Sequence, residues 1–196
     1  MGQALIMERP EHAPISASQL REVMRNYVTG VCVVSTYSEV DGIRRHNAVT
    51  VNSLTSVSLD PPLLSVSFGS NSSFLPDLMQ SGVLGMSILG SDAENVARVF
   101  AGNRTQRQEA LQRYPSECGG QTGSILIGGP GWIECRYRNQ LRVGDHVMVI
   151  VEAVGAAFRD PKSLLLFVQG GFRHLEVSAR HNRPQPPGRM DLQEWM

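Results

Sequence analysis

Apolar residues follow a helical spacing near the start of the chain. Leu20, Val23, Met24 and Tyr27 stand at positions i, i+3, i+4 and i+7, which predicts an amphipathic helix that begins at Ser18. Gly30 marks the end of this pattern. We therefore expect one short helix ahead of the first β-rich segment.

Most other apolar residues fall in short runs rich in β-branched side chains, which is the pattern of β-strands. Asp41-Gly42, after the first run, is typical of a hairpin turn. Residues 59–62 (Leu-Asp-Pro-Pro) are expected to break any strand ladder, since proline donates no backbone hydrogen bond. The predicted strands cover residues 31–37, 48–54, 63–68, 83–89, 132–137, 146–158 and 164–168.

Two further helices are predicted between these strands. Residues 73–80 form one, with Pro76 in its first turn and Gly82 closing it. Ser91 or Asp92 could cap another that carries apolar residues on one face. Residues 102–123 are polar and contain glycine, and their pattern predicts no element.

About seven strands and three short helices, without regular strand–helix–strand alternation, favour a mainly β protein. An antiparallel barrel or sandwich with helices at its edges fits this order of elements best. The 196 residues are enough for one domain. We expect a flexible N-terminal arm over 1–17, a domain over 18–178 and a Pro/Arg-rich tail over 179–196.

Composition narrows the partners and the compartment. Eighteen basic and eighteen acidic residues cancel, which argues against nucleic-acid binding. The apolar runs are of strand length, so no membrane span is predicted, and residues 1–15 lack the pattern of a signal peptide. Cys32, Cys118 and Cys135 have no C-x-x-C spacing and are expected to be buried free thiols in a reducing cytoplasm.

The common catalytic signatures are missing from the sequence. It contains no H-E-x-x-H, no G-x-S-x-G and no G-x-G-x-x-G after a strand, and its histidines lack metal-ligand spacing, so no metal site is predicted. Lys162 is the only lysine, so the other 17 basic residues are arginines. These features disfavour a hydrolase, a zinc enzyme and a Rossmann dehydrogenase.

The run from Thr50 to Pro62 carries the most chemistry. It reads Thr-Val-Asn-Ser-Leu-Thr-Ser-Val-Ser-Leu-Asp-Pro-Pro and places six hydroxyl or amide side chains among apolar ones. One interpretation is an exposed strand with a polar face. The other is the wall of a ligand site, where small side chains let backbone groups approach the polar edge of a flat heterocycle. Residue types alone leave both open.

The order of the motifs resembles one family. Five segments together are similar to the flavin reductases of the FMN-binding split-barrel superfamily. They are residues 20–34, residues 50–62, Trp-Ile-Glu-Cys at 132–135, Gly-Asp-His at 144–146 and residues 164–172. These are the small partners of two-component monooxygenases. The resemblance covers about residues 20–175 and implies an antiparallel split β-barrel of six to seven strands.

The resemblance implies an NAD(P)H-dependent flavin reductase. It would transfer a hydride from NADH or NADPH to FMN or FAD, work as a homodimer and supply reduced flavin to a partner monooxygenase. His146 would position the nicotinamide; a strand-end histidine bonded to a carbonyl is the competing interpretation. The flavin-binding residues implied are Thr50, Val51, Asn52, Ser53, Ser56, Val57, Ser58, Ser72, Ser73 and Phe172.

The resemblance also assigns parts of the flavin to parts of the chain. Residues 51–53 would lie along the isoalloxazine, residues 56–58 near its edge and ribityl chain, and Ser72 and Ser73 at the phosphate. With one lysine in the chain, we expect hydroxyls, backbone N–H groups and a helix N-terminus to hold that phosphate. Phe74 stands where many relatives have threonine, which leaves the choice between FMN and FAD open.

Two other functions remain compatible with the sequence. A split-barrel enzyme could retain its flavin and use it on a substrate of its own, and the unusual segment 102–123 would favour this. A carrier or sensor that binds flavin or haem without catalysis could use the same barrel.

Overall fold

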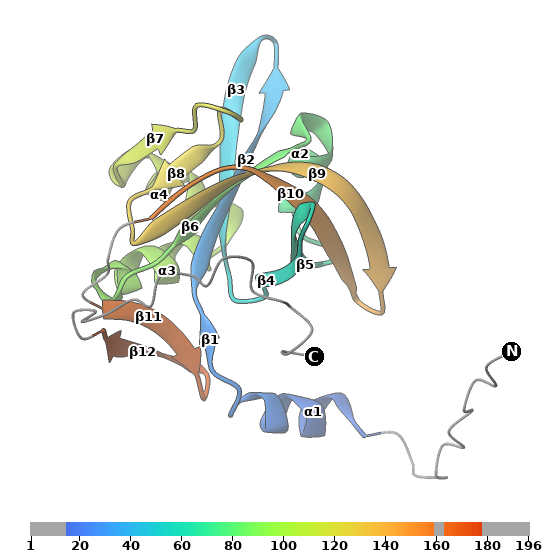
Figure 1. Cartoon of the computed structure of the whole chain (residues 1–196), viewed down its shortest axis with the longest axis vertical. Helices are drawn as coiled ribbons and strands as arrows, with labels where there is room; N and C mark the ends of the chain where they lie inside the picture. Colours follow the sequence, from blue (N-terminus) through green and yellow to red (C-terminus); the bar gives the residue numbers. More distant parts are fainter. Residues whose placement is uncertain (1–14, 159–162, 178–196) are drawn as a thin grey trace, which may run out of the picture.

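A seven-stranded antiparallel sheet forms the body of the computed structural model, which describes residues 15–158 and 163–177. The strand order is β3-β2-β6-β9-β10-β5-β4, and β9 and β10 are the two longest strands (Figure 1). Their bounds are β2 (Cys32–Val40), β3 (Ile43–Val51), β4 (Thr55–Leu59), β5 (Pro62–Gly69), β6 (Val83–Ile88), β9 (Gly131–Val143) and β10 (His146–Phe158).

The two edge strands of this sheet, β3 and β4, follow one another in the chain. Residues 52–54 alone connect them, and so short a link spans at most about 14 Å. The sheet must therefore curl until its two edges approach each other at these residues. This is a barrel with a split between β3 and β4, as the sequence predicts, and we call residues 52–54 the seam.

Two small sheets and four helices surround the barrel. β1 (Thr29–Gly30), β11 (Ser163–Val168) and β12 (Gly171–Glu176) form one sheet, and β7 (Ser116–Cys118) pairs with β8 (Ile125–Ile127). The helices are α1 (Ala17–Met24), α2 (Phe74–Ser81), α3 (Glu94–Phe100) and α4 (Arg104–Arg113). In Figure 1, α1 lies apart from the barrel, beyond β1.

Apolar side chains gather in two clusters. The larger fills the barrel beneath α2 and includes Phe68 and Phe74, whose rings stack at 5.0 Å. The smaller lies under α3 and α4 and includes Phe100 and Leu165. Both clusters combine side chains of the strands with side chains of the helices that cover them.

The main sequence predictions are confirmed. A strand overlaps each of the seven predicted runs, and Asp41 and Gly42 form a tight turn with φ of 53° and 74°. Gly82 ends α2 at φ 67°, in the left-handed region that favours glycine. The first helix starts at Ala17, because Ser16 and Gln19 form a capping box.

Other predictions were wrong. Residues 59–62 do not break a ladder: Leu59 pairs with Pro62 in the β4–β5 hairpin, where one proline occupies the turn and the other begins a strand. Ser91 and Asp92 do not cap α3, because they belong to a 3-10 turn, η1 (Ser91–Ala93), that precedes it. Cys118 is an exposed thiol, although Cys32 and Cys135 are buried as expected.

The predictions for the two ends fall largely outside the described residues, which exclude 1–14 and 178–196. Within the described part, no helix combines the length and the apolar character needed to cross a membrane.

Candidate active site

Ser53 fixes the seam against the barrel. Its hydroxyl donates to the carbonyl of Ser67 at 3.0 Å and accepts from the N–H of Ser67 at 3.1 Å. A side chain thus supplies the bonds to β5 that a neighbouring strand would otherwise make. Because the ladder is interrupted here, neighbouring seam residues need not pair with a strand, and the side chain of Asn52 is exposed.

A groove of about 350 Å³ lies beside Asn52. Its walls come from the end of α1, from β1 and from the turn between β11 and β12, with Met24, Tyr27 and Phe167 among the apolar residues. The Thr29 hydroxyl in this wall is buried and has no hydrogen-bond partner among the described residues. An apolar slot with a few polar groups, one of them unsatisfied, fits a flat heterocycle such as isoalloxazine.

The loop from Gly69 to Ser73 connects β5 to α2 and carries three serine hydroxyls, and we call it the serine loop. The hydroxyl of Ser72 accepts from the N–H of Phe74, the first residue of α2, at 3.3 Å. Ser73 has a different partner: its hydroxyl accepts from Nη2 of Arg107 at 3.1 Å. Hydroxyls at a helix N-terminus are suited to a phosphate, so the loop fits the phosphate of a flavin.

Arg107 is a site residue that the sequence did not reveal. It is 8% exposed, its Nη1 donates to the carbonyl of Gly102 at 2.8 Å, and its Nε has no partner among the described residues. Burial, together with the nearby charge of Arg104, lowers the pKa of Arg107. It escaped notice because α4 has almost no apolar pattern: its buried residues are Arg107 and Ala110.

His146 stands beside this loop. It is the first residue of β10 and pairs with Gly69 of β5, while the carbonyl of Asp145 accepts from the N–H of Ser70 at 2.9 Å. The imidazole is exposed, and its Nδ1 lies 2.7 Å from Oδ1 of Asp145. The hydrogen-bond partner of the ring among the described residues is thus a carboxylate rather than a carbonyl. The bond to His146 lowers the pKa of Asp145.

The structure brings several predicted residues to one end of β5. Ser53 binds Ser67, Gly69 is two residues further along, and His146 pairs with Gly69. Two residues of a strand span about 7 Å, so the seam, the serine loop and the histidine are close neighbours.

The other predicted residues lie differently. Thr50 donates to the carbonyl of Ala97 at 2.8 Å, and Val51, 8% exposed, has its side chain in the core. Ser56 and Ser58 pair with Leu64 and Leu63, toward the far end of β5, and Val57 sits at the register shift between them.

Phe172 lies on β12, behind Phe167 of the groove wall. It packs edge-on against Phe167, with the guanidinium of Arg98 5.0 Å from its ring centre. Its contact with a flavin, like those of Thr50, Val51 and residues 56–58, stays a prediction.

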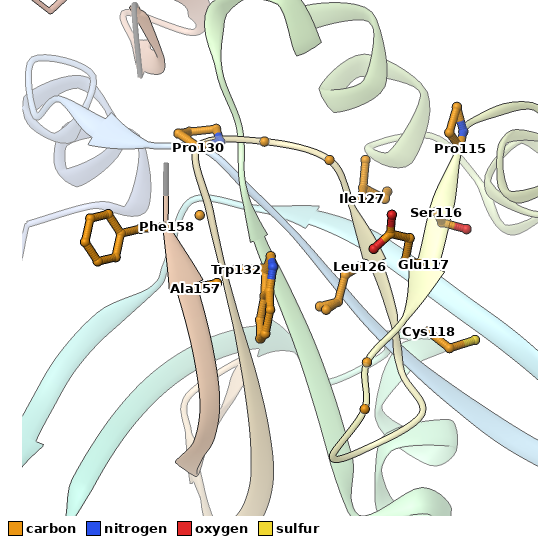
Figure 2. A pocket seen from close by; sticks show the side chains of 15 residues that line it. Pro115, Ser116, Glu117, Cys118, Leu126, Ile127, Pro130, Trp132, Ala157 and Phe158 are labelled. Atoms are coloured by element: carbon orange, nitrogen blue, oxygen red, sulfur yellow. The ribbon is translucent and has the colours of Figure 1, made fainter. Parts of the chain in front are cut away.

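A larger cavity, of about 670 Å³, lies elsewhere, between the β7–β8 hairpin and the ends of β9 and β10. Figure 2 shows Trp132 near its centre, with Leu126 to one side and Phe158 to the other. None of the predicted site residues lines it. Size alone would therefore place the site away from the serine loop and from His146.

Comparison with known proteins assigns the family. The model of the flavin reductase like domain matches residues 24–176. The chain belongs to this family. A curated relative, an NADH-dependent flavin reductase from Rhodococcus sp, is 31% identical over 171 residues, which are 87% of this chain and 92% of the relative.

Solved structures agree with this assignment. BorF, the flavin reductase component of a bacterial two-component tryptophan halogenase, is 32% identical with a TM-score of 0.74, over 83% of this chain and all of BorF. The NADH:FAD oxidoreductase SgcE6 of Streptomyces globisporus, in complex with NAD and FAD fragments, is 29% identical with the same TM-score, over 83% of this chain and 94% of that one. The split-barrel fold expected from the motifs is confirmed.

Proposed function

We propose that this flavin reductase transfers a hydride from NADH to FMN or FAD and hands the reduced flavin to a partner monooxygenase. The observation that carries the proposal is that the seam, the serine loop and His146 lie together at one end of β5. The match to the flavin reductase family gives this arrangement its meaning. The relatives support the donor and the partner: one is an NADH-dependent flavin reductase, and BorF is a component of a two-component system.

When bound, a flavin supplies the ring that accepts a hydride from the reduced nicotinamide. The chain's own residues position the two partners. Backbone groups of the seam bind the polar edge of the isoalloxazine, and Ser72 and Ser73 bind the phosphate at the start of α2. His146 orients the carboxamide of the nicotinamide. Holding both rings in contact makes the hydride transfer effectively intramolecular.

The site also suits a flavin that must leave after reduction. Asn52 and His146 are exposed, and the groove beside Asn52 is open rather than enclosed. The five residues of the serine loop, Gly-Ser-Asn-Ser-Ser, include no basic side chain. Moderate affinity permits release of the product to an oxygenase.

A second copy of the chain completes the groove beside Asn52. Helix α1 has no buried residue, and its apolar side chains Leu20, Val23 and Met24, with Tyr27 just beyond, are largely exposed. Such an uncovered apolar helix face marks an interface, and two-fold dimers are the commonest assembly. Because α1 lines the groove, its partner surface would also shape the flavin site.

The dimer is tested by light scattering. The wild type is expected to have the mass of two chains, and Val23→Asp to shift the mass toward one chain and to weaken flavin binding. Glu22→Gln changes an exposed charge on the same helix and serves as the control. A monomeric wild type at concentrations where it reduces flavin would overturn this part of the proposal.

The activity is tested by mixing purified protein with NADH and excess FMN or FAD while following nicotinamide absorbance. Steady oxidation that rises with free flavin supports a reductase that releases its flavin. Reduction of one bound flavin per chain, and no more, would point to an enzyme that retains its flavin for its own substrate. No oxidation with any combination, in protein that binds flavin, would point to a non-catalytic carrier.

A further inference from the structure

Arg107 is a buried cation for which the described residues provide no anion. Its hydrogen-bond partners among the described residues are the hydroxyl of Ser73 and the carbonyl of Gly102, both neutral. The buried carboxylate of Asp77, whose residue lies four positions after Ser73, is already engaged by Asn47 at 2.7 Å and by Arg104 at 3.5 Å. A buried charge without a counter-ion is costly, and a bound anion would remove that cost.

The bond between Arg107 and Ser73 determines what the serine can do. A hydroxyl has one hydrogen to donate and two lone pairs, whereas guanidinium can only donate. Because Arg107 occupies a lone pair, the Ser73 hydrogen remains available for an acceptor. Ser73 precedes α2 but does not use its hydroxyl to cap the helix. The hydroxyl is therefore free for a ligand that accepts hydrogen bonds.

A ligand at Ser73 must accept hydrogen bonds, and it should also carry negative charge. Two guanidinium groups, of Arg107 and Arg104, stand against the single carboxylate of Asp77. The N-terminus of α2 adds partial positive charge. A phosphate monoester, with a charge of roughly −1.5 to −2 at pH 7 and three acceptor oxygens, meets both requirements.

We propose that Arg107 is the cationic anchor for the phosphate of the flavin, acting on it through the Ser73 hydroxyl at the start of α2. This rests on the proposed function, because it names the residue that selects phosphorylated flavin at that same site. Arg107 comes from α4, the segment where the sequence predicted no element, and it supplies the charge that the loop itself lacks. It is a positioning residue and takes no part in hydride transfer.

The experiment compares FMN with riboflavin, which has the same ring system and ribityl chain but no phosphate. Their dissociation constants are measured by quenching of flavin fluorescence in the wild type, Arg107→Met and Arg107→Lys. We expect Arg107→Met to weaken FMN about tenfold or more, because it removes the buried positive charge that orients Ser73 toward the phosphate, with riboflavin binding unchanged. Arg107→Lys should be intermediate, since it keeps the charge but not the two-pronged geometry.

Two controls separate anchoring from folding. Arg113→Met removes an exposed guanidinium from the same helix and should leave both dissociation constants unchanged. Inorganic phosphate should compete with FMN in the wild type and lose this effect in Arg107→Met. If Arg107→Met does not fold, Ser73→Ala replaces it: it keeps the arginine, removes the bridging hydroxyl and should selectively weaken FMN.

The outcomes are distinguishable. Equal weakening of FMN and riboflavin, or an unchanged FMN constant, would overturn the role of Arg107. A wild type that binds neither flavin would overturn the proposed function instead.

Discussion

The imidazole Nδ1 of His146 lies 2.7 Å from the carboxylate Oδ1 of Asp145. An ionised carboxylate can only accept, so in the neutral ring Nδ1 carries the hydrogen. Nε2 is then an acceptor. A hydrogen-bond acceptor next to the serine loop is suited to the amide hydrogens of a nicotinamide carboxamide.

Removal of this ring should impair use of NADH. We expect His146→Ala to raise the KM for NADH, or lower kcat, by about tenfold or more, which corresponds to one or two kcal/mol of lost orientation. The flavin dissociation constant and the melting temperature should change little, because the side chain is exposed. Asp145→Asn should have a smaller effect in the same direction. Intact NADH kinetics with a lowered melting temperature would make His146 a structural residue.

The flavin wall beyond the seam can be tested at Ser56. Its side chain is exposed on the edge strand β4, so a leucine fits without disturbing the core. If the ribityl chain runs along β4, Ser56→Leu should raise the flavin dissociation constant several-fold at unchanged melting temperature. Thr55→Leu, next to it on the strand, is the control. Unchanged affinity for flavin would confine the site to the seam and the serine loop.

Sequence patterns located the strands because their apolar residues alternate or cluster where each strand enters the core. The family resemblance, rather than a local pattern, points to Ser72, Ser73 and His146, and their roles stay predictions. Sequence patterns did not show that the run from Thr50 to Pro62 holds the ends of two edge strands joined at a seam. The two prolines were expected to interrupt the ladder, but a proline in a turn or at the first position of a strand leaves the ladder intact.

Arg107 illustrates a second limit of sequence patterns. A helix whose inward positions are an arginine and an alanine has no apolar period to detect. Its link to Ser73, 34 residues away, is a tertiary contact and has no local signature. The position of Arg107 beside Ser73 depends on this tertiary contact, so the sequence pattern does not reveal it.

Glu134 should be important for stability rather than for chemistry. Its carboxylate is buried, and Oε1 accepts from the N–H groups of Gln121 and Thr122 and from the Thr122 hydroxyl, at 2.8 to 3.0 Å. Glu134→Ala would leave these donors unpaired and is expected to lower the free energy of unfolding by about 2–4 kcal/mol. Glu134→Gln keeps an acceptor oxygen and should cost less. Urea unfolding measures both, and equal losses for the two variants would contradict the hydrogen-bond explanation.

His46 predicts how stability depends on pH. Burial, and to a lesser extent the charge of Arg44, lowers the pKa of His46 below its ordinary 6.5, and its Nδ1 is buried without a partner among the described residues. Below pH 6.5 the unfolded chain therefore binds a proton that the folded chain resists, and stability falls as the pH drops toward the folded pKa. His46→Gln should reduce the drop in melting temperature between pH 7.5 and pH 5, and Arg44→Met should do so more weakly. Thermal melts at the two pH values decide the matter: if wild type and His46→Gln lose the same number of degrees, another group causes the acid sensitivity.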